Sequence, residues 1–227
     1  VRQIFKLMVP AIFGVSVAQI NLIVDMVIAS FLITGSISWL YYSDRIIEFP
    51  LGIFGIAMAT AILPTLSKQA SEKDSLAFRK TIGWSMRWVW LIGVPAAAGT
   101  VILADPILTT LFAYGEMGQF DIMQSTQSLV AYAIGLPAFI CIKVLAPGYF
   151  ARQDTVSPVK IGIIALLTNI VLNLVLVSHL DHVGLALATS LSAWLNATLL
   201  WVGLRKKDLI VGSFGGRLFL LRVFLAT

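Results

Sequence analysis

Three charged residues lie within five positions of an otherwise apolar segment: Asp44, Arg45 and Glu48. The segment runs from Ser36 to about Leu66, which is long enough for a membrane helix. An ionised side chain at membrane depth costs roughly 2.5–3.5 kcal/mol on insertion scales, so such groups pair, face water or bind a polar substrate. Counted from Ser36, Arg45 lies roughly 13 Å below the outer end of the helix. The cluster therefore predicts a polar path or site inside a membrane bundle.

Within this cluster, Arg45 and Glu48 share one helix face and can form an ion pair. Asp44 precedes Glu48 by one helical turn and lies on a neighbouring face. One interpretation is a self-neutralising ion network that holds helices together. The other, which we favour, is a cation that faces a cavity and binds an anionic substrate. Arginine suits a phosphate because its planar fork makes two parallel hydrogen bonds.

Two further apolar segments carry polar groups. Asp25 and Asn21 are one turn apart and, with Gln19, give the first segment a polar stripe. That stripe either bonds to another helix or lines a cavity. Lys143 is a possible cavity residue, but it is close enough to the basic end at Arg152 to extend to the membrane surface instead.

Catalytic and metal-binding patterns are weak. His179, Asp181 and His182 have a metal-like spacing, but a turn between two helices is the favoured interpretation. No Ser/His/Asp set, acid–base carboxylate pair or phosphate loop occurs at usable spacing. The single cysteine, Cys141, excludes a disulfide framework and is expected to be a small buried side chain. We therefore expect neither an enzyme nor a bound cofactor or metal.

Composition indicates a membrane protein. Hydrophobic residues make up 59% of the 227 residues and charged residues 12%, whereas soluble domains have about 45–50% and 25%. The mean hydropathy is +0.93. The sequence predicts an all-α, polytopic membrane helix bundle of six transmembrane helices plus a truncated seventh. The predicted spans are 7–33, 36–66, 84–103 with an apolar extension to 112, 123–150, 159–177 and 183–204.

The domain boundary is expected after the sixth span. Residues 1–210 would form one six-helix domain, and residues 211–227 would begin a further helix that is cut off, since a span needs about 20 residues. Pro50, followed by Gly52 and Gly55, predicts a kink near the middle of the second span.

Charge is distributed unevenly between the two sides of the predicted bundle. The connections on the side of the N-terminus hold nearly all of the basic residues, among them Arg2, Lys6, Lys73, Arg152 and Lys207. The opposite connections hold Asp105, Glu116, Asp121 and Asp181, and no Lys or Arg. The positive-inside rule makes the basic side cytoplasmic, with both ends of the chain on it. This topology accounts for the pI near 9.5, and a nucleic-acid partner has little support because no basic surface is interleaved with aromatic residues.

Three stretches resemble a known family. They are residues 35–60 (GSISWLYYSDRIIEFPLGIFGIAMAT), residues 143–155 (KVLAPGYFARQDT) and residues 19–25 (QINLIVD). They are similar to segments of the MurJ (MviN) lipid II flippases, in the multidrug/oligosaccharidyl-lipid/polysaccharide exporter superfamily. The resemblance implies the second, C-terminal lobe of a two-lobed transporter of the bacterial inner membrane.

The same resemblance implies roles for particular residues. The arginine that matches Arg45 faces a central cavity and is thought to engage the substrate's pyrophosphate, with the acid that matches Glu48 close by. The implied partners are a lipid-linked pyrophosphoryl oligosaccharide, membrane lipid and a missing first lobe, on the same protein or on a second chain. Transport would proceed by alternating access between the two lobes.

Three alternatives stay open at this stage. A polysaccharide-lipid flippase or a cation-coupled drug exporter would have the same architecture. A membrane enzyme acting on lipid-linked sugars would need a catalytic acid or a metal site on a loop. A structural bundle without transport would bury Arg45 in a closed ion pair.

Overall fold

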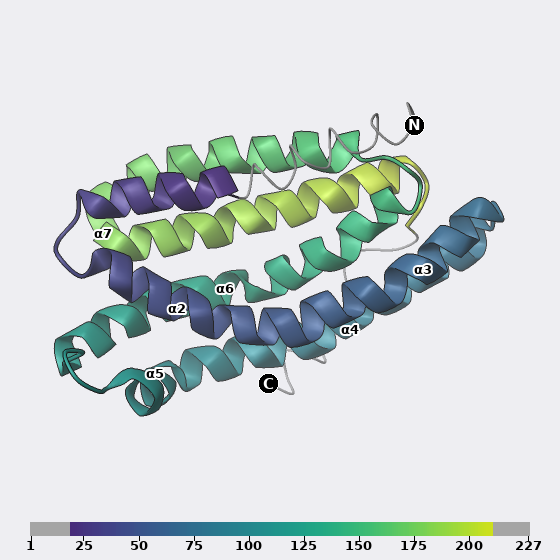
Figure 1. The fold of residues 1–227 in the computed structure, drawn as a ribbon. Coiled ribbons are helices and arrows are strands. Elements are labelled where there is room, and N and C mark those ends of the chain that lie inside the picture. The colour runs from purple at the N-terminus through teal and green to yellow at the C-terminus, as the bar shows by residue number, and fades with distance from the viewer. Residues whose placement is uncertain (1–18, 211–227) are drawn as a thin grey trace, which may run out of the picture.

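The computed structural model describes residues 19–210 as a bundle of long helices (Figure 1). A first helix, of which Gln19–Ser30 is described, is followed by α2 (Ser36–Pro50), η1 (Leu51–Ile56), α3 (Ala57–Ser71), α4 (Ser75–Ile102), α5 (Ala104–Phe112), α6 (Gln119–Phe150) and α7 (Val156–Lys206). Within these residues there is no strand, and the predicted all-α fold is confirmed.

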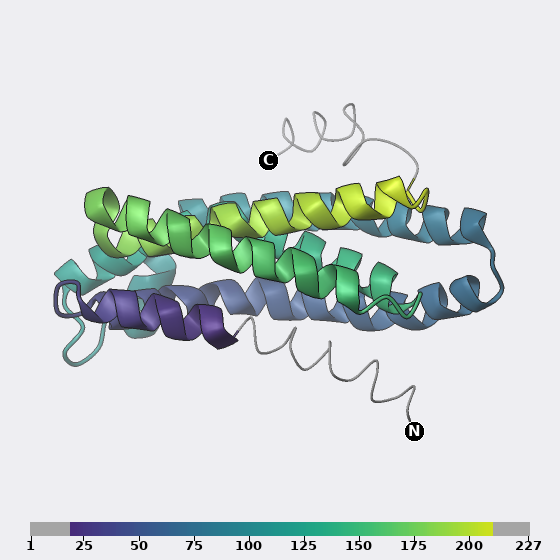
Figure 2. The ribbon, with the colours of Figure 1, turned by 90° about the horizontal axis from the view of Figure 1, so that it is seen from above.

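Four helical stretches are long and apolar enough to cross a membrane: Ser36–Ser71, α4, α6 and α7. Asp181 divides α7 into two helices, because its φ of 48° and ψ of −133° interrupt the helical backbone. The two halves lie side by side and run in opposite directions (Figures 1 and 2). They correspond to the predicted fifth and sixth spans. Residues 7–18 of the predicted first span and the predicted truncated helix at 211–227 lie outside the described residues.

The second span bends where the sequence predicts a kink. Pro50 closes α2, and the next six residues form the π-helical segment η1. Figure 1 shows the chain changing direction between α2 and α3. A proline lacks the N–H that an α-helix needs, and a π-helical turn accommodates such a break.

At two places the helices differ in extent from the predicted spans. The structure extends α3 to Ser71 and begins α4 at Ser75, so both helices continue past the predicted span limits at 66 and 84 and are joined by a short turn. Asp74 stabilises this turn by accepting a 2.9 Å hydrogen bond from the Ala77 N–H at the start of α4. The apolar extension to 112 is a separate helix, α5, because the backbone leaves helical geometry at Leu103.

The connections alternate between the two ends of the bundle (Figures 1 and 2). The α3–α4 turn, the α6–α7 loop and the end of α7 lie at one end, which we call the basic end. The turn before α2, the loop between α5 and α6, and the break at Asp181 lie at the other. In these latter connections, within the described residues, there is no Lys or Arg. The structure thus groups the charged connections as the sequence predicts.

Helix α6 is the centre of the bundle. Its most apolar stretch is 67% buried, compared with 17% for the stretches in Ser36–Ser71 and α7. Side-chain hydroxyls link it to its neighbours, since Ser43 of α2 donates to the Ser125 carbonyl and Ser190 of α7 donates to the Ala131 carbonyl, both at 2.7 Å. Such bonds hold helices together where lipid removes the hydrophobic driving force between them.

Small residues allow the closest helix contacts. A Cβ added at Gly135 of α6 would lie 2.9 Å from the Ser190 Cα, and one at Gly184 would lie 2.7 Å from the Leu176 carbonyl oxygen. Glycine is therefore required where α6 meets α7 and where the two halves of α7 meet.

Candidate functional site

Arg45 and Glu48 of the charged cluster lie on an exposed face of α2, whereas Asp44 is partly buried. Arg45 and Glu48 form the expected ion pair, with Nη1 and Oε2 2.5 Å apart. The pair is not closed off, because the two side chains are 49% and 51% exposed. The guanidinium also lies 4.9 Å from the centre of the Tyr41 ring, a cation–π distance. Arg45 is therefore held in place on both sides while its remaining donors stay accessible.

Helical spacing explains why this face is exposed. Trp39, Ser43 and Ile47 recur every four residues along α2, and all three are buried. They direct one side of α2 against the bundle, as the Ser43 bond to α6 shows. Tyr41, Arg45 and Glu48 follow the other side of the same helix and stay exposed.

Asp25 is the centre of a second polar group, which we call the Asp25 cluster: Asn21, Asp25, Asn169, Asn173 and Thr189. Asn173 of α7 donates to Asp25 Oδ1 at 2.6 Å, and Asn21 donates to Asp25 Oδ2 at 3.2 Å. Asn173 also donates to the Asn169 side chain at 2.9 Å. Thr189 lies 3.5 Å from Asp25 Oδ2. The predicted Asp25–Asn21 stripe thus bonds to both halves of α7.

Sequence reasoning missed the α7 members of this cluster. Asn169 and Asn173 are 1% and 0% exposed, and they are one turn apart in an otherwise apolar helix, which is a signal of its own. Two amide oxygens, Asn21 Oδ1 and Asn173 Oδ1, have no hydrogen-bond donor among the described residues.

The five main predicted site residues fall into two bonded groups. Asn21 and Asp25 bond to one another within the Asp25 cluster, and Arg45 pairs with Glu48 on α2. Asp44 precedes Arg45 on α2 and is partly buried.

Among the described residues, Lys143 forms no ion pair with the other predicted site residues. It is exposed on α6, and its Cγ would be 3.4 Å from a Cβ built at Gly55 of η1. Its stem therefore packs along the π-helical segment. Within residues 19–210 no carboxylate lies at ion-pair distance from its ammonium. Whether it lines a cavity stays a prediction.

The two histidines at the break in α7 are engaged separately. His182 is buried, its ring centre is 4.8 Å from that of Trp39, and its Nε2 lies 3.2 Å from the Gln124 carbonyl oxygen. His179 is exposed beside Ser178. Trp39 in turn donates a 2.8 Å hydrogen bond to Asp121. The predicted turn is confirmed, and no group of three or more His, Cys, Asp or Glu residues with metal-site geometry occurs in the described part of the chain.

Comparison with known proteins identifies the family. A family model described as lipid II flippase MurJ matches residues 1–227. The chain belongs to the MurJ family. A probable lipid II flippase MurJ of Haemophilus influenzae is 53% identical over 232 residues, covering 100% of this chain and 45% of that protein. A second, from Vibrio cholerae serotype O1, is 55% identical over 204 residues, covering 90% of this chain and 39% of that protein.

The chain spans less than half the length of these relatives, and the match lies in their C-terminal part. Among solved structures, lipid II flippase MurJ in an inward closed conformation has a TM-score of 0.83 at 27% identity, covering 97% of this chain and 45% of that one. An outward-facing multidrug resistance MATE transporter of the MOP superfamily has a TM-score of 0.79 at 16% identity, covering 92% and 46%. At this low identity, the similarity to the MATE transporter shows the fold alone. The predicted family and membrane fold are confirmed.

Proposed function

We propose that this chain forms the second lobe of a lipid II flippase of the bacterial inner membrane. The flippase moves a lipid-linked pyrophosphoryl oligosaccharide, the peptidoglycan precursor, by alternating access. Family membership and the match to the C-terminal part of relatives named lipid II flippases support this proposal. The observation that carries it is the half-exposed Arg45–Glu48 pair on a helix that is apolar enough to span a membrane.

The exposed pair argues for a partner lobe. Facing lipid, each charge would cost roughly 2.5–3.5 kcal/mol on insertion scales. A water-filled cavity between two lobes removes that cost and leaves the pair available to a substrate. The complementary lobe would come from the same polypeptide or from a second chain, and the two would rock about a site near the membrane midplane.

Within the cavity, Arg45 would bind the pyrophosphate of the substrate through its planar fork. Glu48 and the Tyr41 ring hold the guanidinium in position. Asp44, Asp25 and Asn21 would complete the polar wall, with Lys143 as a possible further cation. No covalent chemistry is required of these residues.

The orientation of the bundle in the membrane follows from the distribution of its basic residues. The basic end of the bundle carries Lys73, Arg152 and Lys207 in its connections, so the positive-inside rule places it in the cytoplasm. Both ends of the chain would then be cytoplasmic.

Reconstitution tests the proposal. Liposomes would contain this chain alone, the N-terminal lobe of the Haemophilus influenzae relative alone, or both together, with a labelled lipid-linked pyrophosphate substrate. We expect flipping only with both lobes. Robust flipping by this chain alone would refute the two-lobe proposal. Insertion of both lobes without any flipping would refute the assignment of this chain as the second lobe.

A further inference from the structure

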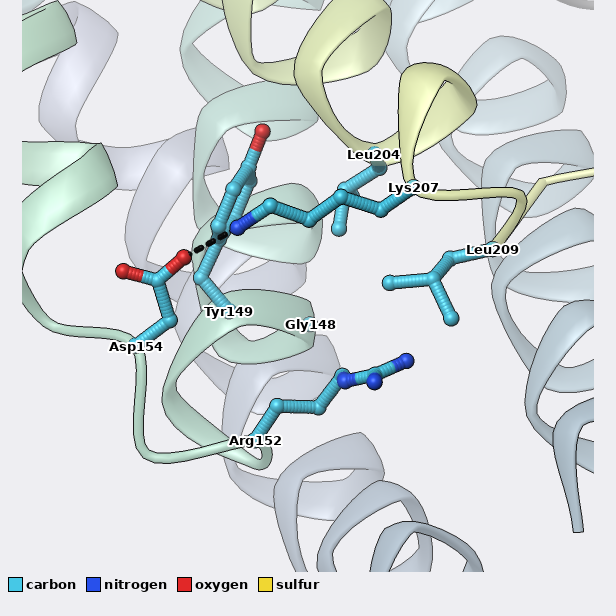
Figure 3. Close-up of a pocket in the computed structure, with 7 residues that line it drawn as sticks. All are labelled: Gly148, Tyr149, Arg152, Asp154, Leu204, Lys207 and Leu209. Atoms are coloured by element: carbon cyan, nitrogen blue, oxygen red, sulfur yellow. Dashed lines mark hydrogen bonds and ion pairs between the residues drawn. The ribbon is translucent and has the colours of Figure 1, made fainter. Parts of the chain in front are cut away.

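The basic end of the bundle contains a hollow of about 280 Å³ (Figure 3). It lies between the end of α6 and the end of α7, and its lining residues are Gly148, Tyr149, Arg152, Asp154, Leu204, Lys207 and Leu209. A neighbouring hollow of about 170 Å³, against the α3–α4 turn, shares Arg152 and Leu209 with it. Arg152 therefore stands at the boundary of two hollows, far along the chain from the Arg45 cluster.

Among the described residues, Arg152 is a cation without a carboxylate partner. Within residues 19–210 no Asp or Glu oxygen lies at ion-pair distance from its guanidinium. Figure 3 shows the guanidinium extending toward Leu209 and away from Asp154. Its planar fork of donors thus faces open space in the hollow.

The nearby carboxylates are all engaged elsewhere. Asp154 accepts hydrogen bonds from the Ser157 N–H at 3.0 Å and from the Ser157 hydroxyl at 2.7 Å, and it pairs with Lys207. Asp208 pairs with Arg79 at 2.8 Å. Asp74 caps α4 through the Ala77 N–H. Asp154 and Asp208 are thus each paired with a basic side chain, and Asp74 shares the second hollow with Lys73.

Lys207 supplies a second positive group at the rim. Its ammonium pairs with Asp154 and lies 5.3 Å from the centre of the Tyr149 ring. Burial by itself would raise the pKa of Asp154, but the bonds from Lys207 and Ser157 outweigh it and hold that pKa below its ordinary value. Asp154 therefore stays ionised and offsets Lys207, so the positive charge of Arg152 is left uncompensated.

We propose that this hollow binds a phosphate group, with Arg152 as its main ligand and Lys207 at its rim. A phosphate accepts the two parallel hydrogen bonds that a guanidinium fork donates. At about 280 Å³ the hollow is just below the roughly 300–1,000 Å³ of small-molecule sites, which suits a headgroup rather than a larger ligand. The phosphate comes from an anionic phospholipid headgroup or from a soluble phosphate. Basic pockets between membrane helices hold headgroups of the first kind.

Native mass spectrometry of the purified protein tests this proposal. The probes are dioleoyl-phosphatidylglycerol, inorganic phosphate, and dioleoylglycerol as a neutral lipid that lacks the phosphate. The variant is Arg152→Gln. The matched control is Arg205→Gln, which removes the same charge from an exposed position at the end of α7 outside both hollows.

We expect Arg152→Gln to weaken phosphatidylglycerol binding about tenfold, a loss typical of hydrogen bonds to a charged group. Arg205→Gln and the neutral lipid should show no such change. Displacement of the lipid by inorganic phosphate, with the same Arg152 dependence, would identify a soluble phosphate as the source; no displacement would identify the lipid. If the Arg152→Gln and Arg205→Gln proteins bind phosphatidylglycerol equally well, and also bind inorganic phosphate equally well, the proposal is overturned.

A second variant guards against misfolding. Arg152→Lys keeps the charge but loses the fork, so its binding should fall between that of the unchanged protein and that of Arg152→Gln. If the Arg152→Lys protein unfolds at the normal temperature but binds as weakly as the Arg152→Gln protein, that result would also contradict the role of Arg152.

Discussion

The side-chain amide of Asn173 donates a 2.6 Å hydrogen bond to the carboxylate of Asp25. The two residues are 148 positions apart in the chain, so the bond exists only once the first helix has packed against α7. Asn173 is fully buried, and its bond to Asn169 fixes the orientation of its amide. This contact joins the predicted polar stripe of the first helix to the body of the bundle.

Removing this donor should destabilise the bundle. Asn173→Ala leaves Asp25 without its shortest hydrogen bond, and a bond to a charged group is worth about 1.5–3 kcal/mol. We expect a clear drop in the thermal unfolding temperature in detergent. Thr168→Ala is the control, because among the described residues the Thr168 hydroxyl bonds only to a carbonyl of its own helix. This change should alter stability by less than about 0.5 kcal/mol. Equal effects of the two changes would contradict the assigned role of Asn173.

A second stability prediction concerns the contact between α6 and α7. Gly135→Ala would place a methyl group 2.6 Å from Ser190 Oγ and 2.9 Å from its Cα. Overpacking of this kind costs about 1–3 kcal/mol. Gly99→Ala is the matched control, since nothing lies within 4 Å of its added Cβ in α4. A Gly135→Ala protein that unfolds no earlier than Gly99→Ala would show that α6 and α7 do not approach as closely as described.

Local features of this fold could be predicted from the sequence. The Arg45–Glu48 pair needs only one helical turn, and the bend after Pro50 needs only the missing proline N–H. The long apolar runs also predicted long helices, and the distribution of Lys and Arg predicted that the basic connections lie at one end.

Features that depend on packing could not be predicted. The bonds from Asn173 and Thr189 to Asp25 require α7 to fold back at Asp181 against the first helix. The separation of α5 from α4 depends on the backbone at Leu103, where the hydrophobic pattern continues without a break. The two hollows at Arg152 arise from three segments, the end of α6, the end of α7 and the α3–α4 turn, which meet only in the folded bundle.

The proposed orientation can be tested by labelling. Cysteines placed at Lys73 and at Gly118 occupy exposed connections at opposite ends of the bundle. In a background where the buried Cys141 is replaced by alanine, an impermeant thiol reagent should reach position 118 from outside intact inner-membrane spheroplasts and position 73 only after lysis. Labelling of position 118 from the cytoplasmic side alone would reverse the assigned orientation.

The central claim is that Arg45 binds the substrate rather than only neutralising its neighbours. In the complete two-lobed protein, Arg45→Ala should abolish flipping while membrane abundance stays nearly normal, because the exposed Glu48 can be solvated without its partner. Arg45→Lys should restore part of the activity, since an ammonium keeps the charge and loses the fork.

The most direct measurement compares flipping and membrane abundance for Arg45→Ala, Glu48→Ala and the double variant Arg45→Leu/Glu48→Leu. If Arg45 only neutralised a buried acid, its removal would cost about 3–5 kcal/mol and the double variant would repair the loss. Our account predicts that the double variant is abundant in the membrane and does not flip substrate. A double variant that is abundant and flips normally would contradict it.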